Sequence, residues 1–531
     1  MTATLLLASA VILLCLALSR ATNRLGVPAL AVFIALGMLF GEDGVFRIEF
    51  NDYVLAERVC SAALVFIMFY GGFGTRWRQA RGTALPAMLL SSVGVVLTAL
   101  FTGVFCHYAL RLSWLEGLLV GAVVSSTDAA SVFSILRSKR LNLKYGTASM
   151  LEVESGSNDP CAYMLTAVLL QMMRGDVSAG SIIGMLAAQV LLGAAVGALM
   201  ALLARWLLNQ MRFSTAGYDA VFIFAVALLS YAGASALGGN GYLSAYITGI
   251  VLGNSDIPCQ RSLVHFFDGV TGLTQMMIFF LLGLVATPSK LPGVAVAGLV
   301  TALFLTLVAR PAAVFAVLTP LRCPARQSLL VSWAGLRGAA SIVFAMMAAI
   351  DPAYLRTDIC HIVFFIVLFS IALQGTLLPR VARRLDMIDD AYDVMKTFSD
   401  YSEETPVQFL KLRIGEDHPW ANKALQAIEM IPDVRVALVD RGGEQLVPRG
   451  QTTLLPGDQV ILSGPSMDGD GLAMLAEMQV EVSHPWAGRC LGDISMPKHQ
   501  LVVMIRRGDE VVIPDGSTVI EAGDVLVMNQ T

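Results

Sequence analysis

A short polar stretch inside an apolar segment carries the strongest chemical signal in this sequence. The run ESGSNDP, Glu154–Pro160, places two carboxylates and an amide within a segment that is otherwise apolar enough to span a bilayer. An ionised group at membrane depth costs about 3 kcal/mol on insertion scales, so such groups usually face the interior of a helix bundle and act on ions or protons. The stretch therefore indicates ion transport across a membrane.

Helical spacing decides which side chains of this stretch can act together. Ser155 and Asp159 are four residues apart and share one face of a helix, while Glu154 and Asn158 share the adjoining face. A glycine and a proline within the run would loosen the backbone around them. One carboxylate and one hydroxyl on a common line suit a dehydrated monovalent cation.

Three further elements place polar groups within apolar segments. The run SSTDAAS, residues 125–131, contains Thr127 and Asp128 and predicts an unwound stretch whose freed carbonyls could coordinate ions. Arg310 is a fixed positive charge deep in an apolar segment and requires a carboxylate partner. The run AGLRGAA around Arg337 is interrupted by glycine. Interrupted spans at corresponding positions in two halves are typical of transporter binding sites.

Structural roles are the alternative for four of these residues. Asp159 could lock helices together through an ion pair, and Asp128 could cap a broken helix without touching a substrate. Ser155 and Thr127 could hydrogen-bond to carbonyls of their own helices. The sequence leaves these alternatives open.

The charged residues Glu154 and Arg310 favour a structural interpretation, in which a buried ion pair holds helices together. Arg337 lies near an internal loop, and it could modulate the site or only anchor its helix.

Composition places most of the chain in lipid. Its 531 residues are 56% hydrophobic and only 14% charged, with a mean hydropathy of +0.69, whereas soluble domains contain about 25% charged residues. The net charge of −4 and the absence of a long basic run give no indication of nucleic acid binding. The histidines and cysteines form no ligand-spaced cluster, so we expect no enzyme, no cofactor and no metal beyond a transported monovalent cation.

About thirteen apolar segments reach spanning length when short and broken ones are included. They lie at residues 3–19, 27–40, 57–74, 83–107, 115–136, 150–172, 180–208, 216–234, 240–254, 263–285, 293–319, 327–349 and 359–384. Lysine and arginine are denser in the loops that follow odd-numbered segments, which predicts an outer N-terminus and a cytoplasmic C-terminus. We therefore expect an all-α polytopic membrane domain over residues 1–385, with inverted repeats and two crossing broken helices.

The rest of the chain reads as soluble and repeated. Residues 386–404 are charged and polar and predict a linker. The run HPWA at His418 recurs at His484, and the same offset then continues without a gap. Alternating apolar runs and turn residues predict two related α+β modules, at residues 405–466 and 470–531.

The membrane motifs resemble those of the monovalent cation:proton antiporter-1 family, NhaP type. ESGSNDP resembles the E-S-x-x-N-D signature of the family, and SSTDAASV, AGLRGAAS and the run LQGT at Leu373–Thr376 resemble its other landmarks, in the expected order across residues 1–385. The soluble repeats resemble the regulatory RCK-C modules, also called TrkA-C, of potassium transport proteins. The combination is similar to NhaP-type potassium/proton antiporters of bacterial inner membranes.

This resemblance implies a role for each matching residue. Asp159 matches the position where cation and protons compete, and Asn158 stands where electrogenic relatives have a second aspartate, which implies electroneutral exchange. Thr127 and Asp128 match the unwound crossing helix that helps to coordinate the ion, and Ser155 matches a supporting ligand.

The family fold implied for the whole chain is a homodimer, with a dimerisation domain and a mobile six-helix core in each protomer. Glu154 and Arg310 match the buried ion pair of the family. The expected activity exchanges cytoplasmic K⁺ for external H⁺, and the sequence leaves open whether Na⁺ is exchanged as well. Na⁺/H⁺ exchange is the alternative, while a gated channel would need a TVGYG-like filter, which the sequence lacks. The cytoplasmic modules could bind a small molecule or nucleotide, or serve only as a dimer clamp.

Position 70 generates a prediction about ion preference. Many sodium-selective relatives carry F-E-G-G where this chain has Phe69–Gly72, with Tyr70 in place of the carboxylate. Fewer charges lower the field strength near a site, which favours the larger K⁺. A Tyr70→Glu variant should therefore shift the ratio of K⁺-driven to Na⁺-driven proton flux in proteoliposomes toward Na⁺. An unchanged ratio would argue against a role for this position in selectivity.

Overall fold

Two compact units divide the chain, Met1–Val394 and Met395–Thr531. The computed structural model describes residues 2–25, 29–48, 50, 52–75, 77, 81–139, 141–175, 178–210, 217–255, 257, 260–289, 291–353, 358–388, 407–416, 418–428, 430, 434–442, 444–465, 474–480, 484–494, 502–507, 510–512 and 514–530. Most of the expected linker, residues 389–404, lies outside the described residues.

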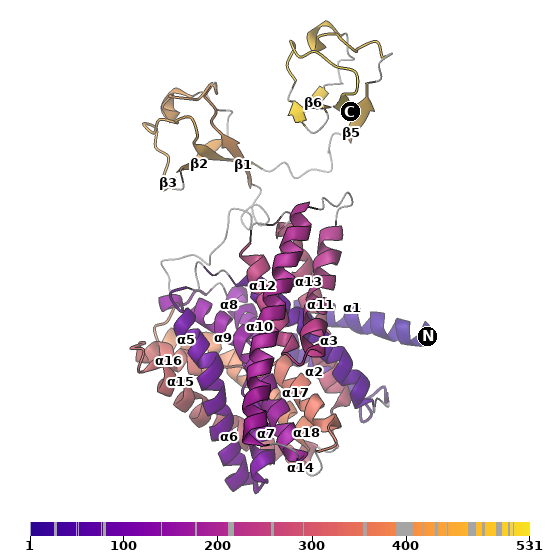
Figure 1. Cartoon of the computed structure of the whole chain (residues 1–531), viewed down its shortest axis with the longest axis vertical. Helices are drawn as coiled ribbons and strands as arrows, with labels where there is room; N and C mark the ends of the chain where they lie inside the picture. The colour runs from indigo at the N-terminus through magenta and orange to yellow at the C-terminus, as the bar shows by residue number, and fades with distance from the viewer. Residues whose placement is uncertain are drawn as a thin grey trace. The chain divides into compact units, whose positions relative to one another are not determined.

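The first unit is an assembly of helices (Figure 1). Its α-helices are α1 (Thr2–Leu25), α2 (Ala29–Phe40), α3 (Tyr53–Gly74), α5 (Ala84–Leu89), α6 (Val95–Leu110), α7 (Trp114–Val123), α8 (Ala129–Ser138), α9 (Thr147–Met173), α10 (Ala179–Gln210), α11 (Tyr218–Ala236), α12 (Gly241–Gly253), α13 (Gln260–Val285), α14 (Leu291–Phe304), α15 (Arg310–Leu318), α16 (Ala325–Trp333), α17 (Ala339–Ile350), α18 (Ile359–Phe369) and α19 (Thr376–Arg384). A short 3₁₀ turn, η2 (Lys144–Gly146), precedes α9.

Seven helices among the described residues are long and apolar enough to cross a membrane. Five shorter apolar helices accompany them, including α7 and α17, each of which forms half of a helix that is broken in the middle. The structure therefore bears out a helical membrane-type domain, whereas the expected number of thirteen crossings is not established by helix length alone.

Three of the long helices contain a π-helical turn. The turns are η1 (Leu90–Gly94) between α5 and α6, η3 (Leu305–Ala309) between α14 and α15, and η4 (Ser370–Gly375) between α18 and α19. Such turns occur mostly as single insertions and often at functional sites. Here η3 ends directly before Arg310. Ser370 of η4 accepts a hydrogen bond from the backbone N–H of Arg337, in the segment between α16 and α17.

Two helices of the first unit are broken in the middle. The first runs from α7 to α8 and is unwound between Val123 and Ala129, and the second runs from α16 to α17 and is unwound between Trp333 and Ala339. The backbone N–H of Asp128 donates to the carbonyl of Leu336 at 2.8 Å, so the two unwound stretches meet and cross. Unwound backbone is tolerated at membrane depth only where protein groups or an aqueous cavity satisfy it.

The second unit contains two four-stranded antiparallel sheets of the same design. Strands β1 (Val407–Arg413), β2 (Arg435–Arg441), β3 (Glu444–Leu446) and β4 (Gln459–Pro465) have the order β1-β4-β2-β3. Strands β5 (Met474–Gln479), β6 (Val502–Arg507), β7 (Glu510–Val512) and β8 (Val525–Gln530) have the order β5-β8-β6-β7. The shared order agrees with the repeat in the sequence, and a short 3₁₀ turn, η5 (Leu425–Ala427) or η6 (Leu491–Asp493), accompanies each sheet.

A buried carboxylate ties each sheet to its loop. In the first sheet, Arg441 donates to both oxygens of Asp458, from Nε and Nη2, at 2.8 Å, and the N–H of Leu455 donates to the same carboxylate. In the second sheet, Arg507 makes the equivalent pair with Asp524 at 2.9 Å. The side-chain hydrogen bonds from Arg441 hold the pKa of Asp458 below its ordinary value.

This ion pair predicts a pH-dependent stability for the first module. Because the pKa of Asp458 is lowered by folding, its stabilisation is fully present above the unfolded pKa of about 3.9 and is lost as the pH falls through the lower pKa of the folded state. In the full chain, Asp458→Asn should lower the opening free energy of β2 and β4 by about 2 kcal/mol at pH 7. Hydrogen exchange measures this quantity strand by strand.

The duplicated module supplies the control. Asp524→Asn should weaken β6 and β8 and leave β2 and β4 unchanged. Equal protection of β2 and β4 in the wild type and the Asp458→Asn variant at pH 7 would contradict the prediction.

Candidate functional site

The ESGSNDP stretch lies in the middle of α9, next to the crossing. Glu154 and Asn158 are fully buried, and Asp159 is 5% exposed. Pro160 lies inside the helix and has no N–H to donate to the preceding turn. The side-chain amide of Asn240, which also caps α12, donates to the Pro160 carbonyl at 2.9 Å.

Ser155 ties α9 to the first unwound stretch. Its hydroxyl donates to the carbonyl of Thr127 at 2.7 Å and accepts the N–H of Ala129 at 2.9 Å. These two bonds satisfy an unwound carbonyl and the first N–H of α8. Ser155 therefore bonds across helices, not back to its own helix, which resolves the alternative that the sequence left open for this residue.

Asn158 and Asp128 also meet partners of the first broken helix. Nδ2 of Asn158 donates to the hydroxyl of Thr127 at 2.6 Å. Oδ1 of Asp128 accepts the N–H of Ser131 at 3.2 Å, and Oδ2 accepts its hydroxyl at 2.5 Å, so Asp128 caps the start of α8. The structure thus brings Thr127, Asp128, Ser155 and Asn158 together around one crossing.

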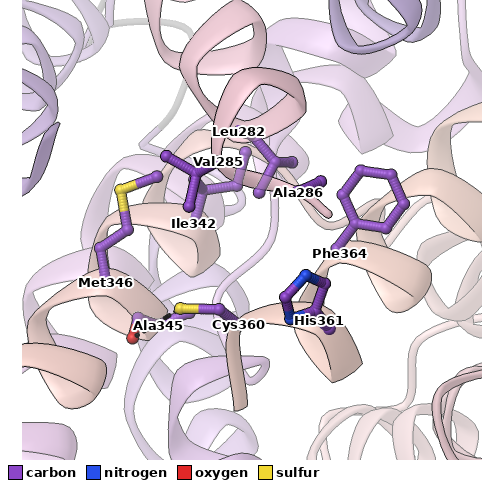
Figure 2. A pocket seen from close by; sticks show the side chains of 9 residues that line it. All are labelled: Leu282, Val285, Ala286, Ile342, Ala345, Met346, Cys360, His361 and Phe364. Carbon is purple, nitrogen blue, oxygen red and sulfur yellow. Dashed lines mark hydrogen bonds between the residues drawn. The ribbon is translucent and has the colours of Figure 1, made fainter. Parts of the chain in front are cut away.

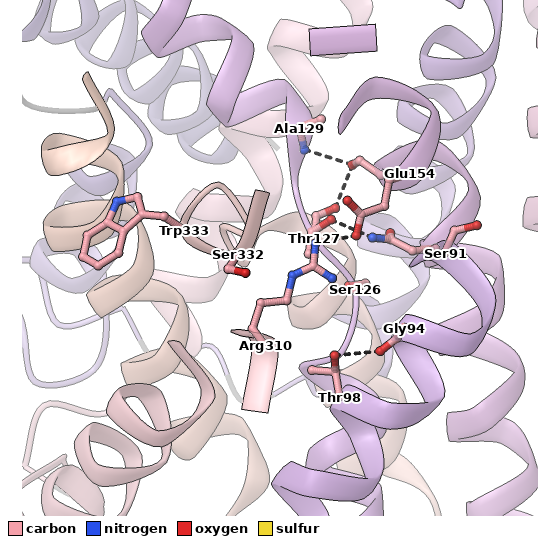
Figure 3. A network of polar contacts seen from close by, with 12 residues as sticks. Ser91, Gly94, Thr98, Ser126, Thr127, Ala129, Glu154, Arg310, Ser332 and Trp333 are labelled. Carbon is pink, nitrogen blue, oxygen red and sulfur yellow. Dashed lines mark hydrogen bonds and ion pairs between the residues drawn. The ribbon is translucent and has the colours of Figure 1, made fainter. Parts of the chain in front are cut away.

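Glu154 forms a buried ion pair with Arg310, the first residue of α15 (Figure 3). Both side chains are at most 1% exposed. Oε2 of Glu154 and the Nε and Nη1 atoms of Arg310 have no hydrogen-bond partner among the described residues. A buried pair costs desolvation energy, and removing one partner leaves the other charge uncompensated.

Arg337 lies in the second unwound stretch and is 2% exposed. Its Nη1 atom donates to the carbonyl of Ser126 at 2.5 Å, and its backbone N–H donates to the hydroxyl of Ser370, in η4, at 2.9 Å. Arg337 therefore contacts the first unwound stretch directly, in addition to its own helix.

The freed carbonyls of the crossing already accept hydrogen bonds from protein groups. Arg337 donates to Ser126, Ser155 donates to Thr127, and Asp128 donates to Leu336. By contrast, two side-chain oxygens beside them, Oδ1 of Asn158 and Oδ1 of Asp159, are buried and have no partner within the described part of the chain. Unpartnered buried oxygens are costly in an apolar interior, and they are the ligand type that a hard monovalent cation takes.

Tyr70 lies on α3, where its hydroxyl donates to the exposed carboxylate of Asp268 on α13 at 3.2 Å. A carboxylate therefore lies beside position 70 even though the chain itself has tyrosine there. The selectivity role of Tyr70 stays a prediction.

An apolar pocket lies away from these residues, between α13, α17 and α18 (Figure 2). Its lining includes His361, whose Nδ1 bonds to Asp358 at 2.6 Å and whose Nε2 accepts the N–H of Thr287 at 3.1 Å. None of the residues around Asp159 lines it. The pocket is therefore distinct from the candidate ion site.

Four residues that sequence reasoning did not assign to the site also contact it. The hydroxyl of Ser126 lies beside Asp159 and 3.4 Å from the hydroxyl of Ser341 on α17. Tyr246 packs its ring against Gly156, where a Cβ would lie 2.4 Å from Cε2 of that ring. The fourth is Asn240. The repeated serines of SSTDAAS were a signal for Ser126, whereas helix α12 carries no such signal.

Comparison with known proteins identifies the family. Residues 9–384 match the family described as "Sodium/hydrogen exchanger, transmembrane", and residues 409–472 and 475–528 each match the TrkA-C domain. The chain belongs to the sodium/hydrogen exchanger family. This is a family of transporters, not of enzymes, and both resemblances drawn from the sequence are confirmed.

Relatives of similar length carry antiporter names. The chain is 35% identical over 472 residues to the "K(+)/H(+) antiporter NhaP2" of Shewanella sp. (strain MR-4), covering 86% of this chain and 80% of the relative. It is 33% identical over 471 residues to the "K(+)/H(+) antiporter NhaP" of Alkalimonas amylolytica, with the same coverage. It is 26% identical over 380 residues to the "Na(+)/H(+) antiporter ApNhaP" of Aphanothece halophytica, covering 68% of this chain and 70% of the relative.

The helical fold is similar to that of a solved antiporter. The structure of the sodium proton antiporter MjNhaP1 from Methanocaldococcus jannaschii matches with a TM-score of 0.63 and 23% identity, covering 71% of this chain and 97% of that one. At this identity the match establishes the fold alone.

The ion pair of this exchanger generates a stability prediction. Glu154→Gln and Arg310→Met should each lower the melting temperature of the detergent-solubilised protein strongly, because breaking a buried pair costs about 3–5 kcal/mol. The double variant should lose less than the sum of the two, since neither charge is then left alone. Additive losses would show that the two side chains are not coupled.

Proposed function

We propose that this protein is an electroneutral antiporter that exchanges cytoplasmic K⁺ for external H⁺ at Asp159. One observation carries this proposal: Asp159 is buried beside the crossing of two broken helices, and its Oδ1 has no partner among the described residues. An unneutralised carboxylate in that position requires a proton or a cation. The names of the relatives from Shewanella and Alkalimonas support K⁺ as that cation.

Competition at one carboxylate is sufficient to couple the two fluxes. Protonation makes Asp159 neutral, and binding of K⁺ compensates its charge, so either loaded form can move through a low-dielectric interior while the empty, charged form cannot. Thr127, Asp128, Ser155 and Asn158 would support the cation as ligands or as the frame that positions them. Binding and release alternate between the two faces of the membrane, and inward proton movement drives K⁺ export.

Asn158 supports a stoichiometry of one for one. Its amide donates to Thr127 and carries no charge, so only one carboxylate of the ESGSNDP stretch, Asp159, is without an arginine partner. Glu154 is neutralised by Arg310, and we propose that this pair persists throughout the cycle. One exchangeable carboxylate binds one charge in each direction, and the membrane potential then has no effect on the exchange.

The proposal extends to the larger architecture expected from the sequence. We propose about thirteen crossings over residues 1–385 with an inverted repeat, a linker at residues 386–404, and two regulatory modules at residues 405–466 and 470–531. The positive-inside pattern supports an outer N-terminus and cytoplasmic modules in a bacterial inner membrane. We expect a homodimer with a mobile six-helix core, and a small-molecule ligand or a clamp role for the modules.

Proton flux in proteoliposomes tests the function directly. Addition of K⁺ should trigger proton movement at a rate that does not respond to an imposed membrane potential. Flux triggered only by Na⁺ would keep the mechanism and change the ion, in line with the name of the Aphanothece relative. A cation current without coupled proton flux would overturn the antiporter in favour of a channel.

The same assay tests the central residue. Asp159→Asn should abolish exchange, because the amide neither takes up a proton nor compensates a cation. Its melting temperature and elution profile should match those of the wild type, which separates loss of function from loss of fold. Retained pH-dependent exchange by a folded Asp159→Asn protein would contradict the assignment.

A further inference from the structure

Two buried serine hydroxyls connect the two broken helices beside Asp159. Ser126 belongs to the first unwound stretch and is 1% exposed, and Ser341 lies in α17 and is fully buried. Their hydroxyl oxygens are 3.4 Å apart, and the side chain of Ser126 lies beside Asp159. The second broken helix thus reaches the candidate ion site through a hydroxyl.

Neighbouring serines of the same helices behave differently. The hydroxyl of Ser125 donates to the carbonyl of Ala122 at 2.6 Å, and that of Ser332 donates to the carbonyl of Ser328 at 2.7 Å. Both side chains are as buried as the first pair, but they bond back to their own helices, as serines in apolar helices commonly do. The hydroxyls of Ser126 and Ser341 instead contact each other across the crossing.

The hydroxyl pair is available to a cation in a way that the backbone is not. The carbonyl of Ser126 already accepts a hydrogen bond from Arg337, and the carbonyls of Thr127 and Leu336 are engaged as well. A contact of 3.4 Å between hydroxyls is at the long end for a hydrogen bond and therefore weak. Each hydroxyl oxygen has two lone pairs and can turn toward a new partner at small cost.

The charges around the pair define what it can bind. Asp159 and Asp128 are the neighbouring acids; Asp128 accepts two hydrogen bonds from Ser131, whereas Oδ1 of Asp159 has no partner among the described residues. Glu154 is engaged with Arg310. A neutral hydroxyl next to a carboxylate that has no arginine partner is a weak-field oxygen ligand, which suits a large monovalent cation better than a small one.

We propose that Ser126 and Ser341 are specificity-determining residues of the ion site, whose hydroxyls bring the second broken helix into contact with the transported monovalent cation. This inference rests on the proposed K⁺/H⁺ exchange and deepens it. Ser126 supplies an oxygen to the cation, and Ser341 positions that oxygen from α17. The selectivity of the site then depends on both halves of the crossing.

Transport kinetics of the full-length protein in proteoliposomes test this inference. Ser126→Ala and Ser341→Ala should each raise the KM for K⁺ by about five- to tenfold, the loss expected for one hydrogen-bonding oxygen, with kcat within twofold of the wild type. The ratio of KM values for K⁺ and Na⁺ should change with them. A merely structural role would lower kcat or the amount of folded protein without moving this ratio.

The matched controls are Ser125→Ala and Ser332→Ala, which remove equally buried hydroxyls from the same two helices. Both should keep the wild-type KM and ion preference. If they shift these values as much as Ser126→Ala and Ser341→Ala do, the inference is overturned. Wild-type protein that shows no K⁺-coupled proton flux would instead overturn the proposed function.

An isosteric variant keeps the test open if an alanine variant does not fold. Ser126→Cys preserves the volume of the side chain but replaces the ligating hard oxygen by a soft sulfur, which disfavours K⁺ relative to the softer Tl⁺. The ratio of Tl⁺-driven to K⁺-driven proton flux should rise above the wild-type value. An unchanged ratio in folded Ser126→Cys protein would overturn the role of Ser126 as a ligand.

Discussion

Backbone groups at membrane depth need protein partners because lipid offers none, and the structure of this exchanger depends on how it meets that constraint at its crossing. Two helices unwind in the middle of the bundle, and each supplies hydrogen-bond partners for the unwound backbone of the other. The N–H of Asp128 meets the carbonyl of Leu336, and Arg337 reaches the carbonyl of Ser126. Ser155 of α9 satisfies two further groups. Because these backbone carbonyls already accept hydrogen bonds, the oxygens that remain available to an ion belong to side chains.

Two carboxylates on one helix acquire different roles from their surroundings. Glu154 and Asp159 are both buried in α9, but only Glu154 has an arginine beside it. The ion pair makes Glu154 part of the frame, since Arg310 compensates its charge. Asp159 has Ser126 and a neutral asparagine near it instead. The same type of side chain thus forms a structural ion pair at one position and a buried carboxylate without an arginine partner at the other.

Two acids of the C-terminal unit, Asp458 and Asp524, have structural roles. Asp458 and Asp524 occupy equivalent places in two sheets of the same strand order, and each accepts two hydrogen bonds from an arginine and one from a backbone N–H. These carboxylates are buried and fully used, so they stabilise loops. The duplication preserves this ion pair, which identifies it as part of the fold of each module.

The sequence by itself determined the membrane class, the ESGSNDP stretch, the two broken helices and the repeated modules, because apolar length, helical spacing and internal repeats are properties of the chain. Only the tertiary structure decided which hydroxyls lie at the crossing of the two broken helices. Ser155 bonds to residues 26 and 28 positions away, and Ser341 lies opposite Ser126 across 215 positions. Tyr70 faces Asp268 of another helix. Helical periodicity defines which residues share a face, but packing alone decides what that face meets.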